Sequence, residues 1–143
     1  MSDLYTSNVL EHIEDDVEVL RSIRSKMLPN AKIAIYVPAF PFLYSSLDHN
    51  AGHFRRYTKK ELILKVVSAG FKVEKCYYSD SLGVPASIAL KVFGYRNRLN
   101  LGSGKSLIIY DRVLFPISQI LDAIGFKFFF GKNLYIFARN SKD

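Results

Sequence analysis

The sequence predicts an α/β fold in which strands and helices alternate along a single domain. Residues 32–37 form a nearly continuous apolar run, which is typical of a central parallel strand that is covered on both faces. Apolar residues between Ile13 and Met27 recur at spacings of three and four, as they do along one face of a helix. Short connections link five such segments in the order strand, helix, strand, helix, strand. This alternation favours a layered sheet with right-handed crossovers.

The elements of the first half follow in order. A short segment rich in β-forming residues, 3–7, predicts the first strand. The helix after it has acidic residues in its first turn, where the helix dipole favours negative charge, and it ends before Pro29. A second helix begins at the capping sequence 58–61, and Gly70 is expected to end it in a left-handed conformation. Residues 71–78 predict the third strand. The apolar faces of the two helices are formed by Ile13, Val17, Leu20, Ile23 and Met27, and by Leu62, Ile63, Val66 and Val67.

The second half predicts two unusually apolar helices and a closing strand. The helices are expected at 85–95 and 106–124, with Pro116 kinking the later one, and a loop rich in Gly and Asn separates them at 97–104. Residues 133–139 predict the last strand. The apolar face of the later helix contains Leu107, Tyr110, Leu114, Ile117, Leu121 and Ile124.

Two interpretations of these apolar helices stay open. They either cover the sheet or its pocket, or they present residues 86–130 to a membrane surface, a lipid-like substrate or a partner. We expect one domain over residues 1–143, with 80–131 as a helical insertion within it.

Composition excludes several classes of protein. With 143 residues, of which 49% are hydrophobic, the chain has material for one core and is not expected to be disordered. The single cysteine, Cys76, excludes an intramolecular disulfide and lies in a predicted strand, where a buried, unreactive thiol is expected. No apolar run approaches the ~18 residues that span a bilayer. The N-terminus lacks the features of a signal peptide, so a soluble, cytoplasmic protein is expected.

The net charge of +7 raises the question of a nucleic-acid partner. Lysine and arginine residues are spread along the chain rather than gathered in a block, and no RNA-binding motif is present. The charge is therefore expected to solvate the surface, with nucleic-acid binding as the alternative.

The most polar candidate site is the loop 37–58, which follows the apolar strand 32–37. In an open α/β sheet, ligands bind at loops that follow the carboxyl ends of strands. Arginine side chains there are suited to clamp a phosphate or carboxylate, and the alternative is that Arg56 or Tyr57 anchors the loop on the sheet. Thr58 and Glu61 are expected only to cap the next helix. The polar candidates are Asp48, His49, His53, Arg55, Arg56 and Tyr57.

Several motifs follow one another in a defined order: residues 8–16 (NVLEHIEDD), 28–30 (LPN), 37–39 (VPA), Asp48, and 52–58 (GHFRRYT). In this order and spacing they resemble the C-terminal half of class I, Rossmann-like S-adenosylmethionine-dependent methyltransferases. The resemblance implies a partial Rossmann-like sheet that is mixed, has about four strands and has an antiparallel last strand. The four predicted strands would then be the fourth to seventh of the family, with the seventh inserted between the fifth and sixth.

The resemblance also implies that something is missing. The family's first three strands have no counterpart, and no Gly-x-Gly turn follows a strand, because Gly102-Ser103-Gly104 lies in a late loop. The strand 3–7 would be left as an open edge. We therefore expect a portion of a larger methyltransferase that is inactive alone. The alternatives are a shortened relative that needs a partner chain or a second copy at that edge, and a non-catalytic docking module that uses it.

The resemblance implies roles for residues at the end of the first strand. Ser7, Asn8 and Val9 would border the adenosyl and sulfonium region of S-adenosylmethionine, or else form a turn with no ligand. His12 would contact the cofactor or act with His53 as a candidate catalytic base that takes a proton from an unidentified methyl acceptor. Acceptor binding is expected from Glu11, Asp48, Arg55, Arg56 and Tyr57.

No metal is expected at this site. Certain quinone and RNA methyltransferases bind a divalent ion through a Glu-x-x-Glu-His pattern and a residue of the later loop. Here Asn8 stands at the first acidic position of that pattern, so the ligand set is incomplete.

Overall fold

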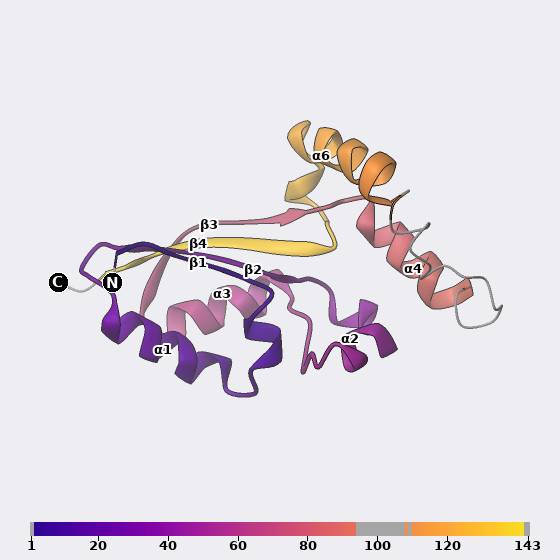
Figure 1. Ribbon diagram of the computed structural model, residues 1–143. Helices are drawn as coiled ribbons and strands as arrows, with labels where there is room; N and C mark the ends of the chain where they lie inside the picture. The colour runs from indigo at the N-terminus through magenta and orange to yellow at the C-terminus, as the bar shows by residue number, and fades with distance from the viewer. Residues whose placement is uncertain (1, 94–107, 109, 142–143) are drawn as a thin grey trace. The chain divides into compact units, whose positions relative to one another are not determined.

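Four strands form one sheet in the order β1-β2-β4-β3 (Figure 1). β1 is Leu4–Ser7, β2 is Lys32–Pro38, β3 is Phe71–Ser79 and β4 is Asn133–Asn140. These bounds agree with the four predicted strands to within two residues. β1 runs parallel to β2, so their carboxyl ends meet at one edge of the sheet.

The last strand lies between the second and third and runs antiparallel to β2. Asn140, at the end of β4, donates its backbone N–H to the carbonyl of Ala31, just before β2 begins. Tyr135, near the start of β4, contacts Tyr36 near the end of β2, with 4.5 Å between the ring centroids. The predicted mixed sheet with an antiparallel last strand is therefore confirmed.

The computed structural model describes residues 2–93, 108 and 110–141. The chain separates into two compact units, one of Met1–Tyr77 with Leu134–Asp143 and one of Tyr78–Asn133. The second unit has nearly the extent of the predicted insertion, 80–131.

One face of the sheet in the first unit carries the core. Helices α1 (Asp16–Lys26) and α3 (Lys59–Ser68) both lie on this face (Figure 1). Each fully buried aliphatic side chain contributes about 1.5–3 kcal/mol relative to an exposed one. The other face is aromatic and only half-buried at Tyr36 and Tyr135, so β2 is fully covered on one face alone. The core residues of the sheet and helices include Ile33, Ile35, Val37, Leu134, Ile136, Leu20, Leu62 and Val66.

The ends of the two helices follow their capping residues. Asp15 caps α1 by accepting a hydrogen bond from the Glu18 N–H, so the helix begins at Asp16, later than the apolar periodicity suggested. Thr58 caps α3 by accepting from the Glu61 N–H, as predicted. Gly70 has φ +93°, which confirms its left-handed conformation after the helix.

The second unit is helical. It contains α4 (Gly83–Phe93), a π-helical turn (Tyr110–Leu114), α6 (Phe115–Ala123) and a 3₁₀ turn (Phe126–Phe128). Pro116 is the second residue of α6, and the π-helical turn before it leads directly into this helix, so the regular hydrogen-bond pattern changes just ahead of the proline. The predicted loop 97–104 and the flanking helix ends at 94–95 and 106–107 lie outside the described residues.

The helical unit exposes many large apolar side chains. Ser118 is buried on α6 and accepts a hydrogen bond from the Leu82 N–H, whereas Ile120 and Ile124 are 64% and 71% exposed. Among the described helices, none is long and apolar enough to cross a membrane. The exposed set is Ile88, Ile108, Val113, Phe115, Ile117, Ile120, Ile124, Phe126, Phe128 and Phe129.

Candidate functional site

The candidate site begins where β1 ends. Asn8 adopts a left-handed conformation with φ 51°, and its N–H donates to the Tyr36 carbonyl of the neighbouring strand. This turn leads into a 3₁₀ helix, Leu10–His12, that carries Glu11 and His12. The predicted cofactor residues Ser7, Asn8 and Val9 are exposed at this carboxyl edge of the sheet.

The loop after β2 contains a helix that periodicity did not predict. α2 (Ser46–Asn50) begins with a capping box, in which the Ser45 hydroxyl and the Asp48 carboxylate bind each other's backbone N–H groups. The spacing Ser45-x-x-Asp48 is itself a capping signal, so it is the feature that would have located this helix. A five-residue helix is too short to show an apolar repeat.

Asp48 organises the loop around its buried carboxylate. Its Oδ1 accepts hydrogen bonds from His53 Nδ1 at 3.0 Å and from Arg56 Nε at 2.9 Å. Its Oδ2 accepts from the Ser45 N–H at 2.9 Å. Burial by itself raises the pKa of Asp48, but the hydrogen bond and charge of Arg56, with smaller contributions from Ser45 and His53, outweigh it and lower that pKa. Asp48 is therefore a carboxylate that holds His53 and Arg56 in place.

His12 and His53 meet although they are 41 positions apart. Their rings form an edge-to-face pair with 4.6 Å between centroids. His12 Nδ1 lies 3.2 Å from the Gly52 carbonyl oxygen. Gly52 has φ +78°, a conformation that residues other than glycine rarely adopt. The Phe54 N–H donates to the Glu11 carbonyl, which fixes the loop against the 3₁₀ helix.

Glu11 completes the cluster. The side chain is fully buried, and its Oε1 lies 4.0 Å from His53 Nε2. Within the described part of the chain, neither carboxylate oxygen of Glu11 has a hydrogen-bond partner. Burial raises the pKa of Glu11, while its own backbone amide and the charges of His53, His12 and Arg56 act in the opposite direction. One ligand atom from each of Glu11, His12 and His53 lies within 4.8 Å of the other two.

A second network anchors the other end of the loop. Asp16, in the first turn of α1, is buried and accepts from Tyr57 Oη at 2.8 Å and from Arg55 Nη1 at 3.0 Å. Lys65 Nζ of α3 lies 2.8 Å from both carboxylate oxygens. Burial by itself raises the pKa of Asp16, but the hydrogen bonds from Lys65 and Tyr57 and the nearby positive charges outweigh it and lower that pKa. The sequence predicts only that the helix dipole stabilises the acidic residues of this first turn.

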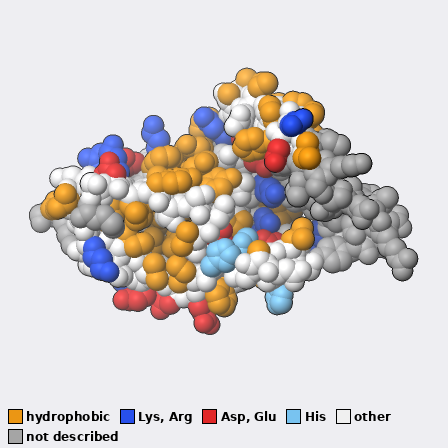
Figure 2. Space-filling view, viewed as in Figure 1, with side chains coloured by type: hydrophobic (Ala, Val, Ile, Leu, Met, Phe, Trp, Pro, Cys, Tyr) orange, Lys and Arg blue, Asp and Glu red, His pale blue; other side chains and the backbone are white. Residues whose placement is uncertain are grey.

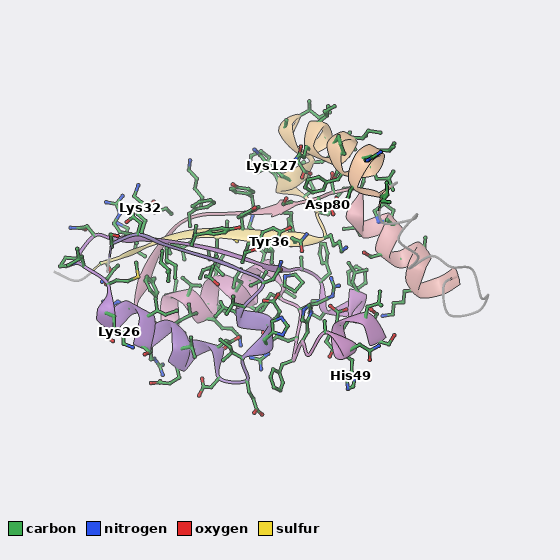
Figure 3. The ribbon with its side chains drawn as sticks, in the orientation of Figure 1. Lys26, Lys32, Tyr36, His49, Asp80 and Lys127 are labelled. Atoms are coloured by element: carbon green, nitrogen blue, oxygen red, sulfur yellow. The ribbon has the colours of Figure 1, made fainter. Side chains whose placement is uncertain are left out.

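The predicted site residues thus separate into groups. Glu11, His12, Asp48, His53 and Arg56 gather at the edge where β1 and β2 end. Arg55 and Tyr57 instead bind Asp16 of helix α1. The anchoring alternative named Arg56 or Tyr57 and the sheet, whereas Tyr57 binds this helix and Arg56 binds Asp48. The remaining histidine, His49, is exposed on α2 and projects away from the sheet (Figure 3). Histidine atoms accordingly appear in two separate places on the surface in Figure 2.

Cys76 of β3 stays outside this site. Burial raises the pKa of its thiol to about 11, so the group is protonated at neutral pH. A protonated thiol agrees with the expected low reactivity, although Cys76 is only half-buried and not buried as predicted.

Several solved structures share this fold. The chain matches a proposed methyltransferase of Haloferax volcanii in complex with the Trm112 methyltransferase activator, with 10% identity and a TM-score of 0.57. It matches a SAM-dependent methyltransferase of Archaeoglobus fulgidus with 18% identity and a TM-score of 0.53. It matches phosphoethanolamine N-methyltransferase 2 of Haemonchus contortus, in complex with S-adenosyl-L-methionine, with 13% identity and a TM-score of 0.50. The chain therefore has a class I methyltransferase-like fold.

The matches cover most of this chain but only part of the other proteins. The match to the Haloferax volcanii protein covers 100% of this chain and 55% of that protein. For the Archaeoglobus fulgidus protein the two shares are 97% and 59%, and for the Haemonchus contortus protein they are 96% and 33%. The chain thus spans between a third and three fifths of their length. No protein-family model and no curated protein sequence matches it.

Proposed function

We propose that this chain, which has a class I methyltransferase-like fold, is the C-terminal portion of an S-adenosylmethionine-dependent methyltransferase. The observation that carries the proposal is the insertion of antiparallel β4 between β2 and β3, next to parallel β1 and β2. This is the order expected for the fourth to seventh strands of the methyltransferase sheet. The partial coverage of the three similar structures supports the same conclusion.

The cofactor side of the proposed site is the exposed turn after β1. Ser7, Asn8 and Val9 border the adenosyl and sulfonium region, and His12 follows them on the 3₁₀ helix. Because no Gly-x-Gly turn follows a strand in this chain, these residues offer one edge of a cofactor site rather than a whole one. Binding of S-adenosylmethionine by the chain alone is therefore expected to be weak.

The acceptor side of the proposed site is the loop that carries Asp48 and His53. His12 and His53 are the candidates for taking a proton from an acceptor hydroxyl or amine, and Glu11 lines the same cluster. Asp48 and Arg56 contribute by holding the imidazole of His53, while Arg55 and Tyr57 contribute by fixing the loop to Asp16. The sulfonium is already activated, so the protein mainly has to align the acceptor with the methyl group and exclude water.

Saturation-transfer NMR with S-adenosylhomocysteine tests this proposal, because it detects weak binding. Saturation is expected to pass from the chain to the adenosine protons, and S-adenosylmethionine is expected to compete. Val9→Asp changes an exposed residue at the proposed edge and is expected to abolish the signal. Val67→Asp, at an equally exposed position on α3, is the matched control and is expected to keep it. Equal signals from both variants would contradict the proposed location.

A partner chain at the β1 edge is the second candidate role. In the described sheet, β1 pairs only with β2, which leaves its outer side available for strand addition. One of the similar structures is a complex with an activator protein, and this favours a partner here without identifying it. Light scattering of the purified chain tests whether a second copy fills this role. A monomer that remains monomeric at all concentrations would exclude self-pairing.

A further inference from the structure

We propose that Glu11, His12 and His53 form a binding site for a first-row divalent transition-metal ion such as Zn²⁺. The donor set of two imidazoles and one carboxylate is that of three-ligand zinc sites that keep a further position open. The prediction from the sequence was that no metal binds here, because Asn8 interrupts an acidic pattern. The structure supplies His53 from the later loop and brings it to the pair at positions 11 and 12.

Both imidazoles are oriented as metal-binding histidines usually are. His53 Nδ1 is 3.0 Å from the Asp48 carboxylate, and His12 Nδ1 is 3.2 Å from the Gly52 carbonyl. Protonation of each Nδ1 toward these acceptors leaves the Nε2 lone pair available. Carboxylates and backbone carbonyls are the groups that orient metal-binding histidines in this way.

Glu11 is the observation that points to a ligand. A fully buried carboxylate that accepts no hydrogen bond is costly, and native structures rarely leave one without a partner. His53 Nε2 is 4.0 Å from Glu11 Oε1, and the imidazole of His12 belongs to the same cluster. A cation at the centre of this cluster would compensate the carboxylate and use one nitrogen of each imidazole.

The size of the cluster is close to that of a metal site. The three ligand atoms lie within 4.8 Å of one another, whereas ligands of a tetrahedral zinc ion are about 3.4 Å apart. Binding thus requires the side chains to draw together by roughly 1 Å. Two nitrogen ligands favour zinc and its neighbours over magnesium and calcium, which prefer oxygen ligands.

The inference does not depend on the proposed methyltransferase function, because all three ligands belong to this chain. If both hold, the ion lies on the acceptor side, where a bound cation lowers the pKa of a coordinated hydroxyl group. It would then assist the acceptor in place of a histidine base. Failure of metal binding would leave the S-adenosylhomocysteine experiment unaffected, so the two proposals fail separately.

Calorimetry of the metal-free chain with ZnCl₂ and MgCl₂ tests the inference. Zn²⁺ is expected to bind with a stoichiometry of one ion per chain, and Mg²⁺ is expected to bind far more weakly. Glu11→Gln and His53→Ala are each expected to weaken zinc binding more than about tenfold. The matched control is His49→Ala, because the chain has three histidines and His49 is the one outside the cluster. The visible spectrum of bound Co²⁺ reports whether nitrogen ligands surround the ion.

Thermal melting of the metal-free variants separates a binding role of Glu11 from a structural one. Glu11→Gln removes an uncompensated buried charge and is expected to raise the melting temperature while it weakens zinc binding. Three outcomes overturn the inference: no binding at one equivalent, zinc affinity unchanged in Glu11→Gln, or loss of binding in His49→Ala. The last would show that zinc binds only at the surface.

Discussion

The Asp48 carboxylate holds the imidazole of His53, with 3.0 Å between Oδ1 and Nδ1. The same oxygen accepts from Arg56, so the carboxylate is fixed from two directions. This arrangement leaves the opposite ring nitrogen of His53 4.0 Å from Glu11. Five polar residues from two separate segments of the chain thereby become one cluster at the carboxyl edge of the sheet.

Asp48→Asn is expected to lower zinc affinity by about 10- to 100-fold, because the amide orients the imidazole less strongly than a carboxylate does. Calorimetry with ZnCl₂ measures the change. Asp48 also belongs to the capping box of α2, so Ser45→Ala serves as the control. That variant removes the cap hydroxyl without touching His53, and zinc affinity is expected to stay within about twofold of wild type. A matching loss in both variants would mean that loop stability, not orientation of His53, controls binding.

Asp16→Asn is expected to lower the unfolding free energy at neutral pH by about 2–4 kcal/mol, because Lys65, Arg55 and Tyr57 lose a buried charged partner. The pKa of Asp16 is lowered in the fold, so its stabilisation is present above the unfolded value of about 3.9 and is lost as pH falls through the folded value. Urea denaturation at several pH values should therefore show that the unfolding free energy of this variant falls less steeply toward acidic pH than that of wild type.

Glu18→Gln is the control for that measurement. Glu18 pairs with Arg21 on the exposed side of the same helix, where an ion pair contributes about 0–1 kcal/mol. The unfolding free energy of this variant is expected to fall toward acidic pH as steeply as that of wild type. An equal slope for wild type and Asp16→Asn would contradict the role given to Asp16.

Asn140→Ala is expected to cost about 1–3 kcal/mol, because buried carbonyls lose a donor. The Asn140 amide donates to the carbonyls of Arg24, Met27 and Leu28, and so ties the end of β4 to the end of α1. Arg139→Ala removes an exposed pair with Glu74 and should cost about 0–1 kcal/mol in the same urea experiment. Equal costs would argue against the contact between the Asn140 side chain and the end of α1.

The exposed apolar side chains of α6 predict binding to lipid surfaces. When phosphatidylcholine vesicles, with and without phosphatidylserine, are sedimented in the presence of the chain, the chain is expected in the vesicle pellet. The double variant Ile120→Ser, Ile124→Ser should recover much less, because both side chains are highly exposed in the described unit. The control, Leu64→Ser, changes an exposed apolar residue on α3 and should sediment as wild type does. If no form sediments, the exposed surface does not bind lipid vesicles, and a partner or packing over the sheet or its pocket remain as interpretations.

The strands and the longer helices were predictable because their buried positions are apolar and recur with the period of a strand or a helix. Residues 32–37 are apolar since β2 lies in the centre of the sheet, and Thr58 and Gly70 mark the ends of α3 by their own local chemistry. α2 was not predicted because a helix of five residues is too short to show a repeat of apolar residues. The spacing of Ser45 and Asp48 is nevertheless that of a helix cap.

The site was predicted only as a set of candidates. Arg55 and Arg56 are neighbours in sequence, yet one binds Asp16 and the other binds Asp48, a division that depends on the path of the folded loop. The meeting of His12 with Gly52 and His53 likewise depends on contacts across some forty residues. No local pattern reports such distances, so the meeting of these residues could not be predicted from the sequence.

Amide shifts during an S-adenosylhomocysteine titration of the ¹⁵N-labelled chain test most directly whether the turn after β1 forms one edge of a cofactor site. Concentration-dependent shifts are expected at the amides of Ser7, Asn8 and Val9. Amides near the opposite end of the sheet, such as those of Lys26 at the end of α1 and Lys32 at the start of β2 (Figure 3), are expected to stay unchanged. Absence of shifts at residues 7–9, or shifts confined to the end near Lys26 and Lys32, would contradict the claim.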